Sequence, residues 1–149
     1  MELSELFAGR EADISAMQGR LSQLAAAEGL PLAKRTRTCN SRRAQELGKW
    51  AESRGFGDPF RRAVYQAYFV AGVNIALVDE LLLIAGSVGL PAEEAREVLV
   101  ARSFAAAVDA DWQRAGELRI TAVPTHLCDG KRLAGFSSYA DFMRLIGKE

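Results

Sequence analysis

Apolar residues recur at three- and four-residue steps along most of the first 116 residues, a spacing typical of helices with one buried face. In the first such stretch the repeating positions are Ile14, Met17, Leu21 and Leu24. Glycines and prolines between the stretches mark helix ends, because glycine accepts the left-handed conformation after a helix and proline cannot continue one. The pattern predicts helices over about residues 3–28, 41–54, 59–71, 78–88, 92–101 and 104–116.

The pattern changes after residue 116. Leu118, Ile120 and Ala122 alternate with polar or small neighbours, which predicts a short extended segment. Pro124 then requires an edge or a bend, because proline has no N–H and favours extended backbone in the residue before it.

A β-hairpin and a last helix follow the proline. Residues 125–128 are compatible with a strand, and Asp129-Gly130 is a strong signal for a hairpin turn. Ser137 or Ser138 is a suitable N-cap for the last helix. Its residues predicted to face inward are Tyr139, Phe142, Leu145 and Ile146.

The predicted fold class is therefore mainly α with a small antiparallel β-hairpin (α+β). Residues 1–116 form the helical region and residues 117–149 the hairpin and its helix, and we expect the two to form one compact unit. A two-stranded ribbon is marginal in water, so strands, helices or another copy of the chain must cover its apolar face. The pattern thus predicts a homo-oligomer that buries the hairpin.

Charge and composition exclude several function classes. Nineteen Lys and Arg residues balance 19 Asp and Glu residues, so we expect neither nucleic acid nor an anionic membrane as a partner. The basic residues at 34–37 and 42–43 lack interleaved aromatic residues for base stacking, which favours a solvated loop and helix start. No signal-peptide pattern is visible, and no stretch approaches the roughly 20 apolar residues that span a bilayer. We expect a cytoplasmic protein.

The two cysteines are far apart in the sequence. Cys39 and Cys128 fit neither a disulfide framework nor a zinc site. Cys39 precedes a predicted helix N-terminus near several arginines, an environment that can lower the pKa of a thiol and make it reactive. The simpler interpretation, which we favour, is a small buried apolar residue at 128 and an incidental thiol at 39.

The remaining candidate residues have structural interpretations. His126 is the only histidine and alternates along the predicted strand, so solvent exposure is favoured over catalysis or metal binding. Asn40 is favoured as an N-cap over a substrate contact. Five aromatic residues fit helical stripes and are interpreted as core: Trp50, Tyr65, Tyr68, Phe69 and Trp112. No phosphate loop, nucleophile elbow or metal motif is present, so no cofactor or metal is expected.

Several motifs together resemble the DsbA-like thioredoxin family. The tail matches its order of a cis-proline bend, strand, turn, strand and helix, here Ala122-Val123-Pro124-Thr125, residues 125–128, Asp129-Gly130, residues 131–134 and residues 138–146. The helical part is similar to the cytoplasmic branch with dithiol–disulfide isomerases, 2-hydroxychromene-2-carboxylate isomerase and kappa-class glutathione transferases. The matching pieces are residues 40–47, 72–75 and 85–91 with Glu93-Glu94.

The departure from the family is as informative as the match. The family's first strand, its Cys-x-x-Cys helix and its second strand would precede Leu3, and no Cys-x-x-Cys occurs in the 149 residues. The resemblance therefore implies the family's helical insertion over residues 1–116 and its C-terminal ββα half over residues 117–149. It leaves open whether this chain by itself is an enzyme.

The resemblance implies a site and three alternative functions. Val123, Pro124 and Thr125 would form the substrate-binding loop, with no catalytic residue in this chain and a thiol-containing protein or glutathione as substrate. The first function is that of a thiol–disulfide oxidoreductase, truncated and inactive as this chain. The second is a non-catalytic binding or oligomerisation module. The third is a relative of glutathione-dependent isomerases or transferases, in which glutathione would be a cofactor of the full-length protein.

Overall fold

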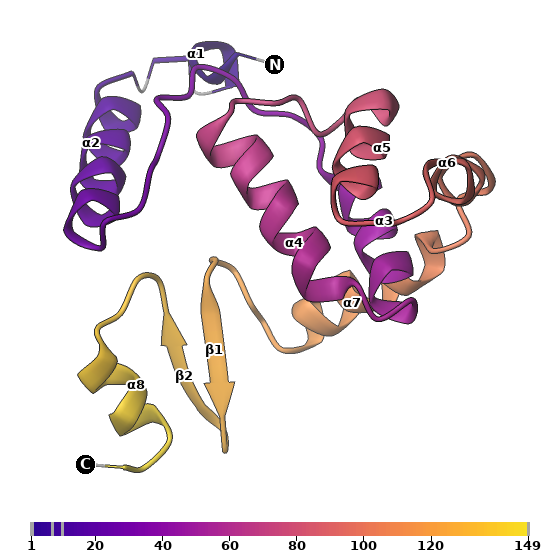
Figure 1. Cartoon of the computed structure of the whole chain (residues 1–149). Helices are drawn as coiled ribbons and strands as arrows, with labels where there is room; N and C mark the ends of the chain where they lie inside the picture. Colours follow the sequence, from indigo (N-terminus) through magenta and orange to yellow (C-terminus); the bar gives the residue numbers. More distant parts are fainter. Residues whose placement is uncertain (1, 7, 10, 149) are drawn as a thin grey trace. The chain divides into compact units, whose positions relative to one another are not determined.

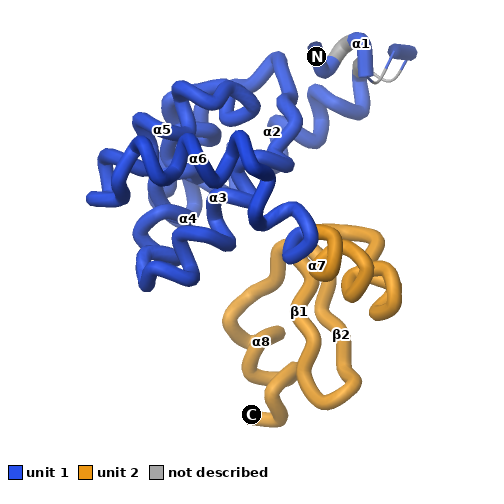
Figure 2. Tube along the Cα trace, turned by 90° about the vertical axis from the view of Figure 1, so that its right-hand side faces the viewer, with its two compact units in different colours: residues 1–108 blue, residues 109–149 orange. Residues whose placement is uncertain are grey.

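The computed structural model describes residues 2–6, 8–9 and 11–148. Contacts divide the chain into two compact units, Met1–Val108 and Asp109–Glu149 (Figure 2). The division lies eight residues before the expected boundary at 116/117, inside a helix that begins in the first unit and ends in the second. The expectation of one compact unit stays a prediction.

Unit 1 is helical. Its elements are α1 (Leu3–Leu6), α2 (Glu11–Ala27), α3 (Arg42–Ser53), α4 (Gly57–Tyr65), the π-helix η1 (Gln66–Val70), α5 (Val78–Ser87), α6 (Ala92–Ala101) and the start of α7 (Ala105–Glu117). The predicted single helix over 3–28 is wrong, because the chain leaves the helix around Gly9, whose φ of 81° is left-handed. The predicted helix over 59–71 starts as an α-helix and widens into η1, where the Ala71 N–H donates to the Gln66 carbonyl.

The core of unit 1 lies between α3, α4, α5 and α6, which pack side by side (Figure 1). Leu47 of α3 and Leu81 of α5 are fully buried, and Phe60 of α4 is 1% exposed. Ala51, Ala85 and Ala95 are also fully buried, and small residues at such positions let helix backbones approach closely. The periodic apolar stripes of these four helices therefore pack together in one core.

Two polar features complete unit 1. The segment between α2 and α3 returns along η1, where the Ala33 N–H donates to the Phe69 carbonyl and the Arg35 guanidinium lies 4.6 Å from the Tyr68 ring centroid. Among the described residues Glu46 is the only charged side chain that is buried, at 1% exposure. Arg42 and Arg102 form ion pairs with it.

Unit 2 holds the end of α7, the strands β1 (Thr125–Cys128) and β2 (Lys131–Ala134), and α8 (Tyr139–Leu145). The strands pair antiparallel with Thr125 opposite Ala134, as predicted, and α8 packs against β2. Asp129 and Gly130 both have positive φ, 48° and 75°, which is typical of the tight two-residue hairpin turn. The mainly helical fold with one small antiparallel sheet is therefore confirmed.

Residues 118–122 are not a strand, so the predicted extended segment is wrong. Arg119 is left-handed with φ of 52°, and the N–H groups of Arg119 and Ile120 donate to the carbonyls of Gly116 and Ala115. This is the Schellman pattern that ends a helix. The N–H groups of residues 118–120 therefore complete α7 and are not available for a ladder with another strand.

Several residues predicted to face inward are exposed instead, among them Tyr65 at the end of α4, which is 57% exposed. Trp112 on α7 is 54% exposed, Tyr139 at the start of α8 is 78% exposed, and Ile146 after α8 is 48% exposed. Phe142 is half-buried and Leu145 is buried, as predicted. The short α8 thus buries only one narrow stripe.

Candidate functional site

A loop of residues 118–124 connects α7 to β1 in unit 2 and contains two of the predicted binding residues, while the third, Thr125, begins β1. The Val123–Pro124 peptide bond is cis. The Val123 side chain is 88% exposed, whereas Thr125 at the start of β1 is half-buried. The structure therefore brings Val123, Pro124 and Thr125 together at the entrance to the hairpin, with Val123 outermost.

Hydrogen bonds from the hairpin hold both ends of this loop. The Arg132 guanidinium on β2 donates to the carbonyls of Arg119, at 2.9 Å, and Leu118, at 2.5 Å. The Thr125 hydroxyl donates to the Ala122 carbonyl at 2.6 Å. The Gly135 N–H donates to the Pro124 carbonyl at 2.7 Å and so extends the β1–β2 ladder by one bond. These bonds fix the start of the loop, after α7, and its end, before β1.

Val123 keeps its backbone groups available. Within the described residues neither its N–H nor its C=O takes part in a hydrogen bond, and both lie beside a highly exposed side chain. An exposed donor and acceptor next to a strand can pair with an extended peptide, the interaction by which a sheet accepts an added strand. At Val123 the loop therefore offers one backbone donor and one acceptor beside β1 that are unpaired within the described residues.

The model of the DSBA-like thioredoxin domain matches residues 3–147, which is nearly the whole chain. The chain belongs to the DSBA-like thioredoxin domain family. Among curated proteins none matches it significantly.

A solved structure gives the same family relationship. The crystal structure of a probable DsbA oxidoreductase from Streptomyces coelicolor is 27% identical in sequence, with a TM-score of 0.83. The match covers 97% of this chain and 63% of that one. This DSBA-like chain therefore matches part of a DsbA-like fold and spans less than two thirds of the length of the solved protein.

Both cysteines of this DSBA-like chain are free thiols and half-buried. Cys128 ends β1, with its Sγ 3.7 Å from the Asp129 carboxylate. Cys39 precedes α3 in unit 1 and packs against the core. It also lines a hollow of about 570 Å³ together with Tyr68 and Asn74. Cys39 belongs to unit 1 and Cys128 to unit 2.

Three of the arginines expected near Cys39 have partners of their own. Arg35 lies over the Tyr68 and Phe69 rings, Arg37 pairs with Glu2, and Arg42 pairs with Glu46. The hypothesis that this cluster activates Cys39 stays a prediction.

His126 is exposed, as the sequence favoured, whereas the N-cap of α3 is Ser41 and Asn40 lies directly before it. The Asn40 side-chain oxygen accepts the Arg42 N–H at 2.9 Å, so it satisfies a free donor at the start of α3. The His126 ring is exposed and meets the Phe142 ring edge-on, with centroids 4.7 Å apart. This contact packs α8 against the hairpin.

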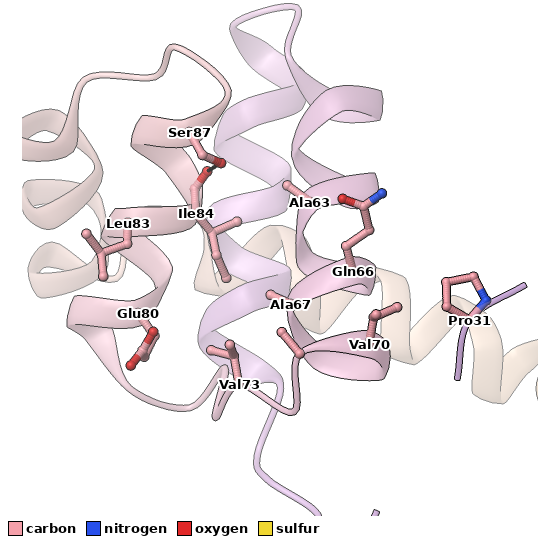
Figure 3. A pocket seen from close by; sticks show the side chains of 11 residues that line it. Pro31, Ala63, Gln66, Ala67, Val70, Val73, Glu80, Leu83, Ile84 and Ser87 are labelled. Atoms are coloured by element: carbon pink, nitrogen blue, oxygen red, sulfur yellow. Dashed lines mark hydrogen bonds between the residues drawn. The ribbon is translucent and has the colours of Figure 1, made fainter. Parts of the chain in front are cut away.

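Unit 1 contains a second hollow that the sequence did not predict. It has a volume of about 460 Å³ between α4, η1 and α5, and Pro31 contributes to its rim (Figure 3). Apolar side chains such as Val70, Leu83 and Ile84 line it, with Gln66 and Glu80 as polar groups. Only the packing of separate elements brings these residues together, so no local motif could have indicated it.

Sequence reasoning also missed Arg132 and Glu46. An arginine in an exposed strand and a glutamate in a helix are ordinary in sequence, and their roles depend on carbonyls and guanidinium groups from distant segments. The described residues contain no cluster of His, Cys, Asp and Glu that could hold a metal ion. Within the same residues, no helix has both the length and the apolar character needed to cross a membrane.

Proposed function

We propose that this chain is the substrate-binding part of a thiol–disulfide oxidoreductase, whose attacking thiolate comes from a segment that the 149 residues do not contain. Membership of the DSBA-like family over residues 3–147 is the observation that carries the proposal. The name of the solved relative, a probable DsbA oxidoreductase, points in the same direction. Neither Cys39 nor Cys128 belongs to a Cys-x-x-Cys pair.

In the proposed reaction a thiolate attacks one sulfur of a substrate disulfide and forms a mixed disulfide. The S–S bond of the substrate breaks, and its other sulfur leaves as a thiolate that takes up a proton. The chain's own contribution is orientation: the N–H and C=O of Val123 pair with the extended substrate backbone on either side of the disulfide. Arg132 and Thr125 keep the loop in place while the substrate binds.

Activity of the isolated chain tests the catalytic half of the proposal. Reduction of a peptide disulfide by this 149-residue chain with dithiothreitol should proceed no faster than with dithiothreitol alone. Turnover that Cys128→Ser or Cys39→Ser abolishes would place the nucleophile in this chain and overturn the proposal.

Peptide binding tests the other half. In ¹⁵N-labelled protein, a peptide with an internal disulfide should shift the amide signals of Val123, Thr125 and Gly135. Val123→Pro removes the proposed donor and should weaken binding on the order of tenfold, whereas Val123→Ala keeps it and should bind as the parent does. Shifts confined to the hollow around Leu83 would contradict binding at the loop. Shifts at the loop with glutathione, and not with the peptide, would favour the glutathione-dependent alternative.

Self-association is a second candidate function. Val123, Phe136 and Tyr139 are large exposed apolar residues in a unit of 41 residues, and their exposed fractions are 88%, 57% and 78%. Such surface in a small unit favours a partner, and a second copy of the chain is our proposal. Sedimentation velocity should then give a dimer that Tyr139→Ser dissociates, whereas a monomer at all concentrations would exclude this candidate.

A further inference from the structure

The buried Glu46 carboxylate is held by two arginines at once. The Arg102 guanidinium donates two hydrogen bonds to it, from Nε to Oε2 at 2.8 Å and from Nη2 to Oε1 at 2.6 Å. The Arg42 Nε donates to Oε1 at 2.8 Å. The two hydrogen bonds from Arg102 fix the orientation of its guanidinium relative to the carboxylate, in addition to the attraction between their opposite charges.

The three side chains come from places where helices begin or end. Arg42 is the first residue of α3, and Glu46 lies one turn later on the same helix. Arg102 follows α6 in the left-handed conformation, with φ of 54°, and the Ser103 N–H donates back to the Val98 carbonyl. The ion pairs therefore join the start of α3 to the end of α6.

Arg42 also contacts a third helix. Its Nη2 donates at 3.0 Å to the carbonyl of Ala105, the first residue of α7. The next turn of α7 contributes Val108, which is 2% exposed. From there α7 continues into unit 2 and ends where the loop of residues 118–124 begins.

A buried ion pair is a poor source of net stability, because removing two charges from water costs about as much as their attraction returns. An apolar side chain at position 46 could fill the same space. The specific gain from the charged arrangement is geometric: one guanidinium bonds to Glu46 and Ala105 at the same time, which an apolar contact does not reproduce.

We propose that Glu46, Arg42 and Arg102 are positioning residues that anchor the first turn of α7, the helix that leads to the binding loop. The anchoring of α7 follows from the contacts above, whereas its importance for substrate binding rests on the proposed function. None of the three side chains touches substrate in this proposal. They act through α7.

Hydrogen exchange of the α7 amides tests the anchor. Arg42→Lys keeps a positive charge beside Glu46 but replaces the planar fork with a single ammonium group, so it should lose the bridge to Ala105. Exchange at residues 108–112 should then accelerate on the order of tenfold, the effect expected from one lost charge-assisted bond. Val64→Ala is the matched control, because it creates a cavity in α4 and leaves the anchor intact.

The outcomes separate anchoring from general destabilisation. Faster exchange at 108–112 in Arg42→Lys, together with unchanged exchange there in Val64→Ala, supports the anchor. Unchanged exchange at 108–112 in Arg42→Lys overturns it, and so does equal acceleration at those amides in both variants. Glu46→Gln provides a second variant, in which the same amides should accelerate.

The peptide titration distinguishes failure of the anchor from failure of the proposed function. Arg42→Lys should weaken binding of the disulfide peptide several-fold, with hairpin signals of residues 126–134 unchanged in the free protein. If the unaltered chain does not bind the peptide but the exchange result holds, only the proposed function is wrong. If it binds and Arg42→Lys changes neither exchange nor affinity, only the anchor is wrong.

Discussion

At the scale of single residues, the most important polar side chains lie at helix ends. They form hydrogen bonds with free backbone groups or ion pairs with a side chain of opposite charge. Ser138 accepts the Asp141 N–H and Asp141 accepts the Ser138 N–H, which is a complete capping box at the start of α8. The serine was identified from sequence as a cap, because serine is a common residue at that position. The partners of Arg132 and Arg102 were not identified, because they are carbonyls and a carboxylate far away in the chain.

Replacing Ser138 tests the capping box. Ser138→Ala should lower the free energy of unfolding of unit 2 by about 1 kcal/mol, since the Asp141 N–H loses its acceptor and the Asp141 carboxylate loses the bond from the Ser138 hydroxyl. Ser22→Ala, on an exposed position in the middle of α2, should have little effect. Hydrogen exchange of the α8 amides is measured in both variants and in the parent chain. Equal exchange rates in Ser138→Ala and the parent would contradict the role of the capping box.

Acid should weaken the protein through Glu46. The two hydrogen bonds from Arg102, against the opposing effect of burial, hold the pKa of Glu46 below its usual value, and Arg42 acts in the same direction. Because the folded pKa is the lower one, the contribution of Glu46 to stability is complete above the unfolded pKa of about 4.3 and is lost as pH falls toward the folded pKa.

The expected measurement is a urea titration of stability between pH 7 and pH 3. Glu46→Gln should be less stable than the parent by about 2 kcal/mol at pH 7, and this difference should shrink below about pH 4. Glu97→Gln, on an exposed position of α6, controls for the loss of one negative charge. A difference that stays constant with pH would show that the ionised form of Glu46 is not the stabilising one.

At the scale of elements, helix ends and the hairpin turn decide where each element stops. Helices α2, α3 and α5 end in glycines with positive φ, at Gly29, Gly55 and Gly89, and these ends were predicted. The ends of α6 and α7 use the same geometry with Arg102 and Arg119. Arginine carries no turn signal, so the segment after α7 was misassigned as extended.

The hairpin turn offers a test of the same geometry. Gly130→Ala should destabilise the hairpin by about 1–2 kcal/mol, because φ of 75° is costly for a residue with a Cβ. Gly86→Ala in α5 is the matched control: no atom lies within 4 Å of the added Cβ, and alanine should stabilise the helix by up to about 1 kcal/mol. Thermal unfolding of both variants checks the opposite signs.

At the scale of the whole molecule, the two units differ in how much core they have. Unit 1 buries large residues from α3, α4, α5 and α6, whereas Leu145 is the buried apolar residue among the described residues of unit 2. A unit of 41 residues buries too little apolar surface to be very stable alone. The exposed apolar residues around β1 and α8 are consistent with this shortage.

Amide hydrogen exchange should therefore be slower in unit 1 than in unit 2. The amides of Leu47, Leu81 and Ala85 should have the largest opening free energies. The opening free energies of the amides in β1 and β2 should be lower by several kcal/mol. Native-state hydrogen exchange measures this directly. Equal protection in the two units would indicate that unit 2 gains support from contacts beyond its own residues.

The sequence by itself determined the helical order, the hairpin with its Asp129-Gly130 turn, a serine cap at position 137 or 138 and the family resemblance. These features depend on local periodicity and on residues with strong backbone preferences, and local preferences are readable without a structure. The tertiary structure alone decided the burial of Glu46, the tether from Arg132, the end of α7 at Arg119 and the hollow beside η1. Each of these depends on partners far apart in the chain, and the energy of a contact between distant residues leaves no pattern in the local sequence.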